Sequence, residues 1–321
     1  MPTAAAAEPV EIRFQASGVQ FAALTWGPED GRLALCLHGY PDTAWTWRHL
    51  GPFLGARGWR VVASFMRGYA PTDLAPDGIY QIGALARDAI ETHATLGGDG
   101  EAALIGHDWG AIAAYTAGAR APERFRRIVA LAVPPLTTAF KPLTSPRRLL
   151  ADLPLVAQQL RMSWYVLFQQ VPWISEHSLA WLIPRLWAAW SPSFDAREDL
   201  ERVFAALNES GRRNAALCYY RALLQPWYRS REYASEQANL FQLPSRPVLY
   251  LHGAQDGCVH PEFAQRALSG LPSGSEVELV PGAGHFLQLE RPEPVNERIG
   301  TFLESGQNQT FGWSSLVEFG Y

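Results

Sequence analysis

The sequence predicts an α/β fold: a mostly parallel β-sheet that is covered by helices on both faces and interrupted by a long helical insertion. Three observations support this prediction. Short apolar runs alternate with segments of helical periodicity, the apolar runs are continuous rather than alternating with polar residues, and the rhythm stops over residues 135–245. Continuous apolar runs between helices are typical of strands that are buried on both faces of a parallel sheet.

The predicted strands are short runs rich in apolar and β-branched residues. In chain order they are 10–15, 19–26, 33–39, 59–65, 102–106, 126–133, 248–253 and 275–280. Helical spacing and helix-terminating glycines mark several of the segments between them. These predicted helices are 82–97, 109–120, 261–270 and 293–304. Alternation of strands and helices favours parallel pairing of the strands.

The insertion divides the chain into a core in two parts and an inserted unit. Residues 1–134 and 246–305 form the predicted core domain, and residues 135–245 form the predicted helical cap domain. Residues 306–321 are a C-terminal tail rich in Gly, Ser and Asn. The sequence leaves open whether this tail lacks a fixed structure or docks through its aromatic side chains.

The composition excludes several classes of protein. The net charge of −4, with no basic block, argues against a nucleic-acid partner. The cysteines Cys36, Cys218 and Cys258 are odd in number and far apart, which argues against a disulfide framework or a zinc site and suits a reducing compartment. The N-terminus lacks a signal-peptide pattern, and no apolar run is long enough to span a membrane. We therefore expect a cytoplasmic monomer or homodimer with no membrane partner.

Asp108 stands at the centre of the most informative stretch, GHDWG at 106–110, between a predicted strand and a predicted helix. Small residues, Gly106 and Gly110, lie two positions before and after it. A sharp strand–turn–helix crowds these two positions and lifts the central side chain above the sheet edge. An aspartate that only caps the helix does not require glycines on both sides. The pattern therefore favours a nucleophile over a helix cap.

Two further residues follow strands that end at the same edge of the sheet. His285 lies in the loop after strand 275–280, and Asp256 lies in the turn after strand 248–253. Catalytic groups gather at this edge of α/β sheets, and a histidine base is oriented by an acid. A solvent-exposed loop histidine and an ordinary Asp-Gly turn are the alternatives. The chain order of nucleophile, acid and base is more specific than any one of the three residues.

The stretch HGYPD at 38–42 makes a tight turn after the third predicted strand. We expect the backbone N–H groups of Tyr40 and Trp109 to bind an oxyanion that forms on an ester of Asp108. We expect the other residues of this turn to have a structural role at the site; they are His38, Gly39 and Pro41. His38 is expected to brace the loop through hydrogen bonds.

These motifs resemble those of α/β-hydrolase-fold epoxide hydrolases, and the similarity runs through roughly residues 10–305. The matching stretches are HGYPD, MRGYAPTD, GHDWG, the turn at Asp256 and GAGHF. The resemblance implies an α/β-hydrolase fold in which the insertion forms a lid. It also implies that Tyr165 and Tyr220 take the positions of two active-site tyrosines. The chain departs from the family pattern at Cys218, where Asn is usual, and before MRGY, where an Asp often stands.

The resemblance implies a two-step reaction that needs no metal and no cofactor. The Asp108 carboxylate attacks a carbon of an epoxide and forms an alkyl-enzyme ester, while Tyr165 and Tyr220 stabilise the leaving alkoxide. His285, oriented by Asp256, then activates water against the ester. The expected partners are a small-molecule epoxide and water, and the expected product is a vicinal diol.

We expect the lid to cover a mainly apolar pocket in which Trp109, Trp164 and Phe168 contact the substrate. The closest alternative is a haloalkane dehalogenase, which would use the same three reacting residues with indole N–H groups as halide donors. The insertion is rich in tryptophan, with Trp164, Trp173, Trp181, Trp187 and Trp190. The lid tyrosines and Tyr40 favour the epoxide interpretation.

A different class of protein also remains open. Fold does not fix function, so a non-catalytic ligand-binding protein on the same scaffold is a second alternative. Such a protein would not depend on the carboxylate of Asp108 for chemistry. Replacement of Asp108 by Asn therefore separates the two interpretations: it abolishes turnover in an enzyme but alters only ligand affinity in a binding protein.

Overall fold

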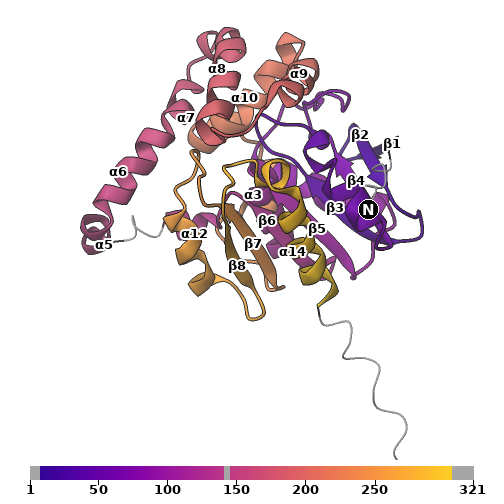
Figure 1. Cartoon of the computed structure of the whole chain (residues 1–321). Coiled ribbons are helices and arrows are strands. Elements are labelled where there is room, and N and C mark those ends of the chain that lie inside the picture. The colour runs from indigo at the N-terminus through magenta and orange to yellow at the C-terminus, as the bar shows by residue number, and fades with distance from the viewer. Residues whose placement is uncertain (1–7, 141–144, 306–321) are drawn as a thin grey trace, which may run out of the picture.

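The computed structural model describes residues 8–140 and 145–305 (Figure 1). Two segments lie outside the described residues. They are the start of the chain, whose sequence lacks a signal-peptide pattern, and the C-terminal tail with Phe311 and Trp313. The centre of the structure is an eight-stranded sheet with the order β1-β2-β4-β3-β5-β6-β7-β8. The predicted α/β fold is therefore confirmed.

The sheet is parallel except at one end. β1 pairs with β2 and β2 pairs with β4 in antiparallel register, and every later pair is parallel. Each predicted strand forms, with its ends within two residues of the expected positions. The strands are β1 (Val10–Ala16), β2 (Val19–Trp26), β3 (Arg32–Leu37), β4 (Trp59–Ser64), β5 (Ala102–His107), β6 (Phe125–Leu131), β7 (Val248–Gly253) and β8 (Glu276–Val280).

Helices cover both faces of the sheet, and alternate residues of a strand pack against opposite faces. In β3, Leu35 belongs to the core cluster that includes residues of α2 and α3, whereas Ala34 and Cys36 belong to the cluster that includes residues of α1 and α14. This double burial explains why the strands are continuously apolar. The helices around the sheet are α1 (Leu50–Gly55), α2 (Ile82–Thr95), α3 (Trp109–Arg120), α12 (Glu262–Ala267), α13 (Leu287–Glu290) and α14 (Pro292–Glu304).

The segment between β6 and β7 is helical where the structure describes it. Its longest helix, α8, buries Leu179, Leu182, Ile183 and Leu186 along one side, which is the spacing of an amphipathic helix. The helices of this insertion are α4 (Leu136–Ala139), α5 (Pro146–Ala151), α6 (Leu153–Met162), α7 (Trp164–Phe168), α8 (Ile174–Trp190), α9 (Arg197–Ala206), α10 (Ser210–Leu224) and α11 (Ala234–Gln237). Two short 3₁₀ helices, Pro226–Tyr228 and Arg231–Tyr233, precede α11.

Specific contacts hold this insertion against the core. The Trp187 ring of α8 stacks on Phe286 with ring centroids 3.5 Å apart, and its indole Nε1–H donates a hydrogen bond of 2.9 Å to the Pro41 carbonyl. The Arg48 guanidinium pairs with the largely buried Asp199 carboxylate of α9 at 2.6 Å. Pro41 and Phe286 both lie in loops that follow strands, so α8 covers the edge where these strands end. Figure 1 shows α8, α9 and α10 gathered on this side of the molecule.

Among the described residues, the helices lack the combination of length and apolar character that a membrane span requires.

Candidate active site

Asp108 occupies a strained turn between β5 and α3. Its backbone angles are φ 52° and ψ −116°, which few residues other than glycine adopt. A Cβ on Gly106 would lie 2.2 Å from the Gly110 carbonyl oxygen, and a Cβ on Gly110 would lie 2.2 Å from the carbonyl oxygen of Leu37. The two glycines therefore permit the close packing that holds this turn above the sheet edge.

The Asp108 carboxylate lies directly over the HGYPD loop. The Tyr40 backbone N–H donates a hydrogen bond of 2.8 Å to Asp108 Oδ1. A Cβ on Gly39 would lie 2.4 Å from this oxygen, so only glycine allows the carboxylate to sit here. Trp109 is the first residue of α3. Among the described residues, its backbone N–H does not donate a hydrogen bond to the Asp108 carboxylate. The turn thus offers the carboxylate one formed backbone hydrogen bond.

The HGYPD loop is braced from below by His38. Its Nδ1–H donates to the Gly39 carbonyl at 2.8 Å, and its Nε2 accepts the Met66 backbone N–H at 3.0 Å. Burial lowers the pKa of His38 to about 4, so the ring is neutral and Nε2 is free to accept. Pro41 contributes its carbonyl to the indole of Trp187, which ties the loop to α8.

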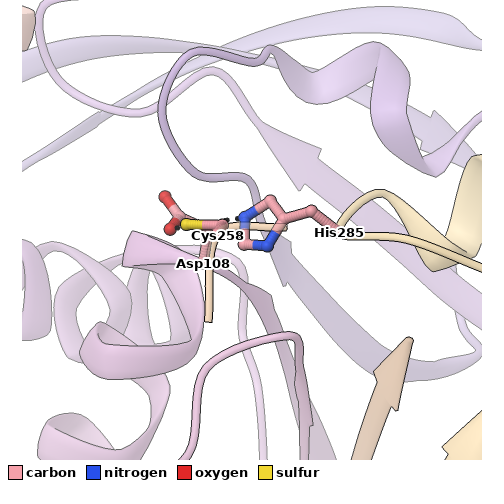
Figure 2. A group of neighbouring side chains, drawn as sticks. All are labelled: Asp108, Cys258 and His285. Atoms are coloured by element: carbon pink, nitrogen blue, oxygen red, sulfur yellow. Dashed lines mark ion pairs between the residues drawn. The ribbon is translucent and has the colours of Figure 1, made fainter. Parts of the chain in front are cut away.

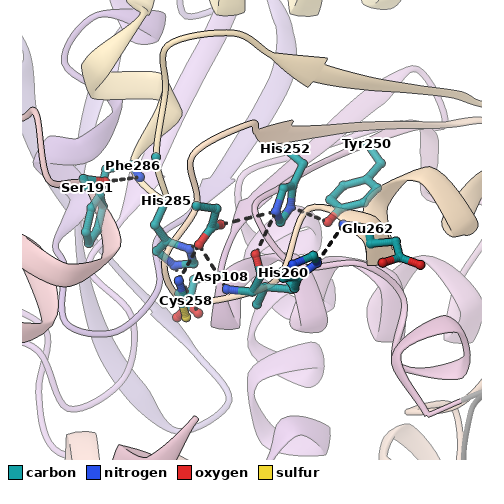
Figure 3. Close-up of polar contacts among 12 residues, drawn as sticks. Asp108, Ser191, Tyr250, His252, Cys258, His260, Glu262, His285 and Phe286 are labelled. Atoms are coloured by element: carbon teal, nitrogen blue, oxygen red, sulfur yellow. Dashed lines mark hydrogen bonds and ion pairs between the residues drawn. The ribbon is translucent and has the colours of Figure 1, made fainter. Parts of the chain in front are cut away.

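His285 lies between two carboxylates. Its Nδ1 is 2.9 Å from Asp256 Oδ2, and its Nε2 is 3.6 Å from Asp108 Oδ2. The backbone on either side is also fixed, because the His285 N–H donates to the Trp190 carbonyl and the His285 carbonyl oxygen lies 3.0 Å from His107 Nε2. The imidazole Nε2 is buried and makes no hydrogen bond to any residue that the structure describes. Figure 3 shows the His285 ring close to Asp108 and Cys258.

The loop after β7 orients the Asp256 carboxylate. Asp256 Oδ1 accepts the backbone N–H groups of Cys258 at 2.6 Å and Val259 at 3.0 Å, which leaves Oδ2 directed at the imidazole. Burial alone would raise the pKa of Asp256, but His285 and His252 outweigh burial and lower it. Asp256 is therefore a carboxylate at neutral pH.

The same charges keep a proton on the imidazole. Burial acts to lower the pKa of His285, but the Asp256 and Asp108 carboxylates outweigh it and raise the pKa to about 10. At neutral pH His285 is therefore an imidazolium, which lies between the Asp256 and Asp108 side chains.

Two tyrosines from the insertion close the site from the other side. The rings of Tyr165 (α7) and Tyr220 (α10) are buried and meet edge to face with centroids 5.7 Å apart. The Tyr220 ring also lies 5.0 Å from Tyr40 and 4.8 Å from Trp109, the two residues that flank the carboxylate. Burial raises the pKa of both lid phenols well above the usual value, so both keep their protons. Within residues 8–140 and 145–305, the Tyr220 hydroxyl has no hydrogen-bond partner.

The expected substrate contacts differ in their position. Trp109 is buried, and its ring meets Tyr220 beside the carboxylate. Trp164 is 44% exposed, and its ring lies 5.9 Å from that of Phe168, which is half-buried against the main core. Trp164 therefore lies at the surface of the insertion, and Phe168 lies beneath it.

Sequence reasoning missed two residues at this site. His107, next to the nucleophile position, contacts the His285 carbonyl, and the Cys258 thiol lies 3.4 Å from the Tyr165 hydroxyl. A polar residue beside Asp108 and a cysteine two positions after the acid were the only signals in the sequence. Neither signal reveals a contact with a residue far along the chain.

Comparisons with known proteins show the family to which this chain belongs. A family model described as alpha/beta hydrolase fold matches residues 35–292. The AB hydrolase superfamily protein YfhM of Bacillus subtilis is 29% identical over 90% of this chain and 96% of that protein. Epoxide hydrolase A of Mycobacterium tuberculosis is 26% identical over 92% of this chain and 97% of that protein. The crystal structure of epoxide hydrolase A from Mycobacterium thermoresistibile matches with a TM-score of 0.71 at 25% identity, covering 92% of this chain and 98% of that chain. This chain therefore belongs to the alpha/beta hydrolase fold family, within which it resembles epoxide hydrolases.

Proposed function

We propose that this protein is an epoxide hydrolase that converts an apolar or aromatic epoxide into a vicinal diol without a metal or cofactor. One observation carries the proposal: a buried carboxylate faces an imidazole 3.6 Å away and lies near two protonated phenols from the insertion. A carboxylate supplies the nucleophile that attacks carbon, and the phenols supply the protons that an alkoxide leaving group requires. The names of the relatives point to the same reaction.

In the first step, Asp108 Oδ2 attacks an epoxide carbon and the ring C–O bond breaks. Tyr165 and Tyr220 donate hydrogen bonds to the departing oxygen, and their raised pKa values mean that both carry the proton to be donated. Asp108 Oδ1 remains bonded to the Tyr40 N–H and becomes the carbonyl oxygen of the ester. The imidazolium of His285 faces the attacking carboxylate, with Nε2 3.6 Å from Oδ2.

In the second step, water attacks the carbonyl carbon of the ester and His285 accepts its proton. Esterification neutralises Asp108, which removes one of the two negative charges that raise the pKa of His285. The imidazolium then gives up its Nε2 proton more readily. This proton passes to the tyrosine that protonated the departing oxygen, and the neutral ring acts as the base. Asp256 keeps Nδ1 protonated and oriented, and the Tyr40 N–H stabilises the oxyanion, with the Trp109 N–H as the second expected donor.

We propose that residues 135–245 act as the cap over this site, with residues 1–134 and 246–305 as the core domain. Tyr165 and Tyr220 come from the insertion, whereas Asp108, Asp256 and His285 come from the core. The stacking of Trp187 on Phe286 holds the two parts together next to the base.

A haloalkane dehalogenase is less well supported. Its halide would need indole N–H donors at the site, but Trp164, Trp173 and Trp181 are 44%, 71% and 48% exposed and lie at the surface. The indole N–H of Trp187 is already bonded to a backbone carbonyl. Trp109 and Trp190 lie close to the reacting groups.

A product assay tests the proposal. Purified full-length protein is incubated with styrene oxide and, in parallel, with a 1-haloalkane, and both diol and halide are measured. We expect diol without halide release, and no diol from the Asp108→Asn variant. Halide release without diol would establish the dehalogenase instead. If neither product forms but the wild-type protein and Asp108→Asn both bind the epoxide, the protein is a binding protein on this scaffold.

A further inference from the structure

A thiol lies beside the nucleophile and the base, and the proposed reaction does not use it. Cys258 Sγ, a carboxylate oxygen of Asp108 and a ring nitrogen of His285 all lie within 4.8 Å of one another, and all three residues are buried. Figure 2 shows the three side chains converging from separate loops. The Cys258 thiol also lies 3.4 Å from the Tyr165 hydroxyl, so it faces the reacting groups from its buried position.

This donor set suits zinc. Zn²⁺ is bound in proteins by cysteine sulfur, histidine nitrogen and carboxylate oxygen, and sites with three protein ligands keep a fourth position open. Zinc–ligand bonds of about 2.0–2.3 Å place tetrahedral ligand atoms about 3.5 Å apart, so the distances between these three ligand atoms, at most 4.8 Å, would shorten by about 1.3 Å or less. The strained turn fixes the Asp108 backbone, so rotation about the Cys258 and His285 side-chain bonds would supply most of this movement.

The surroundings of His285 provide an independent indication. Its Nε2 is buried, has no hydrogen-bond partner in the described part of the chain, and faces the Asp108 carboxylate. Its other nitrogen, Nδ1, is bonded to the Asp256 carboxylate at 2.9 Å. Histidines that bind zinc usually donate their second ring N–H to a carboxylate in this way, which orients the ring and increases its basicity. His285 is therefore preorganised as a metal ligand as well as a base.

We propose that Asp108, Cys258 and His285 form a binding site for Zn²⁺, or for another thiophilic divalent cation, and that the bound cation inhibits the enzyme. On binding, the S–H bond of Cys258 breaks, a sulfur–zinc bond forms and the proton passes to solvent. His285 likewise releases its Nε2 proton and donates that lone pair to the metal. No electron is transferred, because Zn²⁺ has no redox chemistry. The cation occupies both the nucleophile and the base, so it competes with the epoxide.

This site revises the expectation that the three cysteines exclude zinc. That expectation rests on the absence of closely spaced cysteines, which is the usual sign of a structural zinc site. Here Cys258 is combined with a carboxylate and an imidazole from distant parts of the chain. Only the folded structure brings these ligands together.

Cobalt provides a test that does not depend on turnover. Full-length protein freed of metal with EDTA is titrated with Co²⁺, because a thiolate bound to Co²⁺ gives a charge-transfer absorption band in the near ultraviolet. We expect one Co²⁺ per chain with this band, and Zn²⁺ should abolish the band by displacement. The Cys258→Ser variant should lose the band and bind Zn²⁺ at least about 100-fold more weakly, since loss even of outer-shell partners costs 10–100-fold in affinity.

Controls separate this site from other thiols and from folding effects. Cys36 is buried in β3, away from the site, so Cys36→Ala should retain both the band and Zn²⁺ affinity. His285→Gln removes a second ligand and should also bind Zn²⁺ weakly. In the wild-type protein, Zn²⁺ should inhibit diol formation competitively, and EDTA should reverse the inhibition.

Two results would overturn the proposal: no thiolate band in the wild-type titration, or unchanged Zn²⁺ affinity in folded Cys258→Ser. The cobalt measurement needs no substrate. Its result therefore tests the metal site even if the protein is not an epoxide hydrolase.

Discussion

The Asp108→Asn variant offers a stable counterpart of the alkyl-enzyme ester. Asparagine has nearly the same shape as aspartate but carries no charge, as the ester does. If the Asp108 carboxylate helps to hold the proton on His285, the substitution should lower the pKa of His285. The same change in charge is proposed to turn the imidazolium into a base during the reaction, so the variant tests the step that links the two halves of the mechanism.

The size of the effect follows from the 3.6 Å between Asp108 Oδ2 and His285 Nε2. At this distance two unit charges interact by about 1 kcal/mol in water and about 4–5 kcal/mol at an effective dielectric constant of about 20. At about 1.4 kcal/mol per pH unit, these energies correspond to about 1 to 3 pH units. The pKa of His285, raised to about 10 in the native protein, should therefore fall to between about 7 and 9 in the variant. The Asp256 carboxylate remains and keeps the pKa above that of an isolated histidine.

NMR titration of the histidine side chains measures this change, with the His285 signal assigned by its loss in His285→Gln. A pKa for His285 that is the same in Asp108→Asn and in the native protein would refute the electrostatic coupling. The kinetic counterpart is the hydrolysis of the preformed alkyl-enzyme. Its rate should rise with pH as the imidazole loses its proton, with a midpoint below the pKa of His285 in the free enzyme.

Three further predictions concern the lid, the core and the nucleophile loop. Tyr165→Phe and Tyr220→Phe should each slow ester formation about 10²–10³-fold in stopped-flow fluorescence, because each removes a hydrogen-bond donor to the leaving oxygen. An unchanged rate would show that the tyrosine does not stabilise the leaving oxygen. Arg67→Ala should lower the free energy of unfolding, measured by urea titration, by about 3–5 kcal/mol, because it leaves the buried Asp88 carboxylate without its partner at 2.5 Å. A loss below about 1 kcal/mol, which is typical of exposed ion pairs, would contradict this prediction. Gly39→Ala should abolish diol formation, because the added Cβ would lie 2.4 Å from the Asp108 carboxylate, while circular dichroism should still show a folded protein. Retained activity would show that the HGYPD loop can move aside.

The sheet could be predicted because burial on both faces leaves a direct trace in the sequence. In β3, Leu35 and Cys36 point to opposite faces and both are fully buried, so the strand reads as a continuous apolar run. The short helix α1 was not predicted, because its sequence LGPFLG contains two glycines and a proline and is too short for helical periodicity to appear. The local sequence thus revealed the elements with many buried neighbours but not the short helix α1.

The site could be predicted only in part, for a similar reason. Parallel strands end at one edge of the sheet, so the loops after β5, β7 and β8 had to bring Asp108, Asp256 and His285 near one another. Tyr165 and Tyr220 were identified only by resemblance to a family, because no local pattern separates them from other aromatic residues of the insertion. The contact of Cys258 with Tyr165 depends on how α7 docks on the loop after β7, which the local sequence does not encode.

The most direct test of the account is the mass of the intact His285→Gln protein after incubation with styrene oxide. Loss of the base should block ester hydrolysis but leave the Asp108 carboxylate able to attack. We predict a gain of one substrate mass per chain, located on the peptide that contains Asp108, and no gain when Asp108→Asn is added to the same variant. An unmodified His285→Gln protein, together with diol formation by the wild-type enzyme, would contradict covalent catalysis by Asp108.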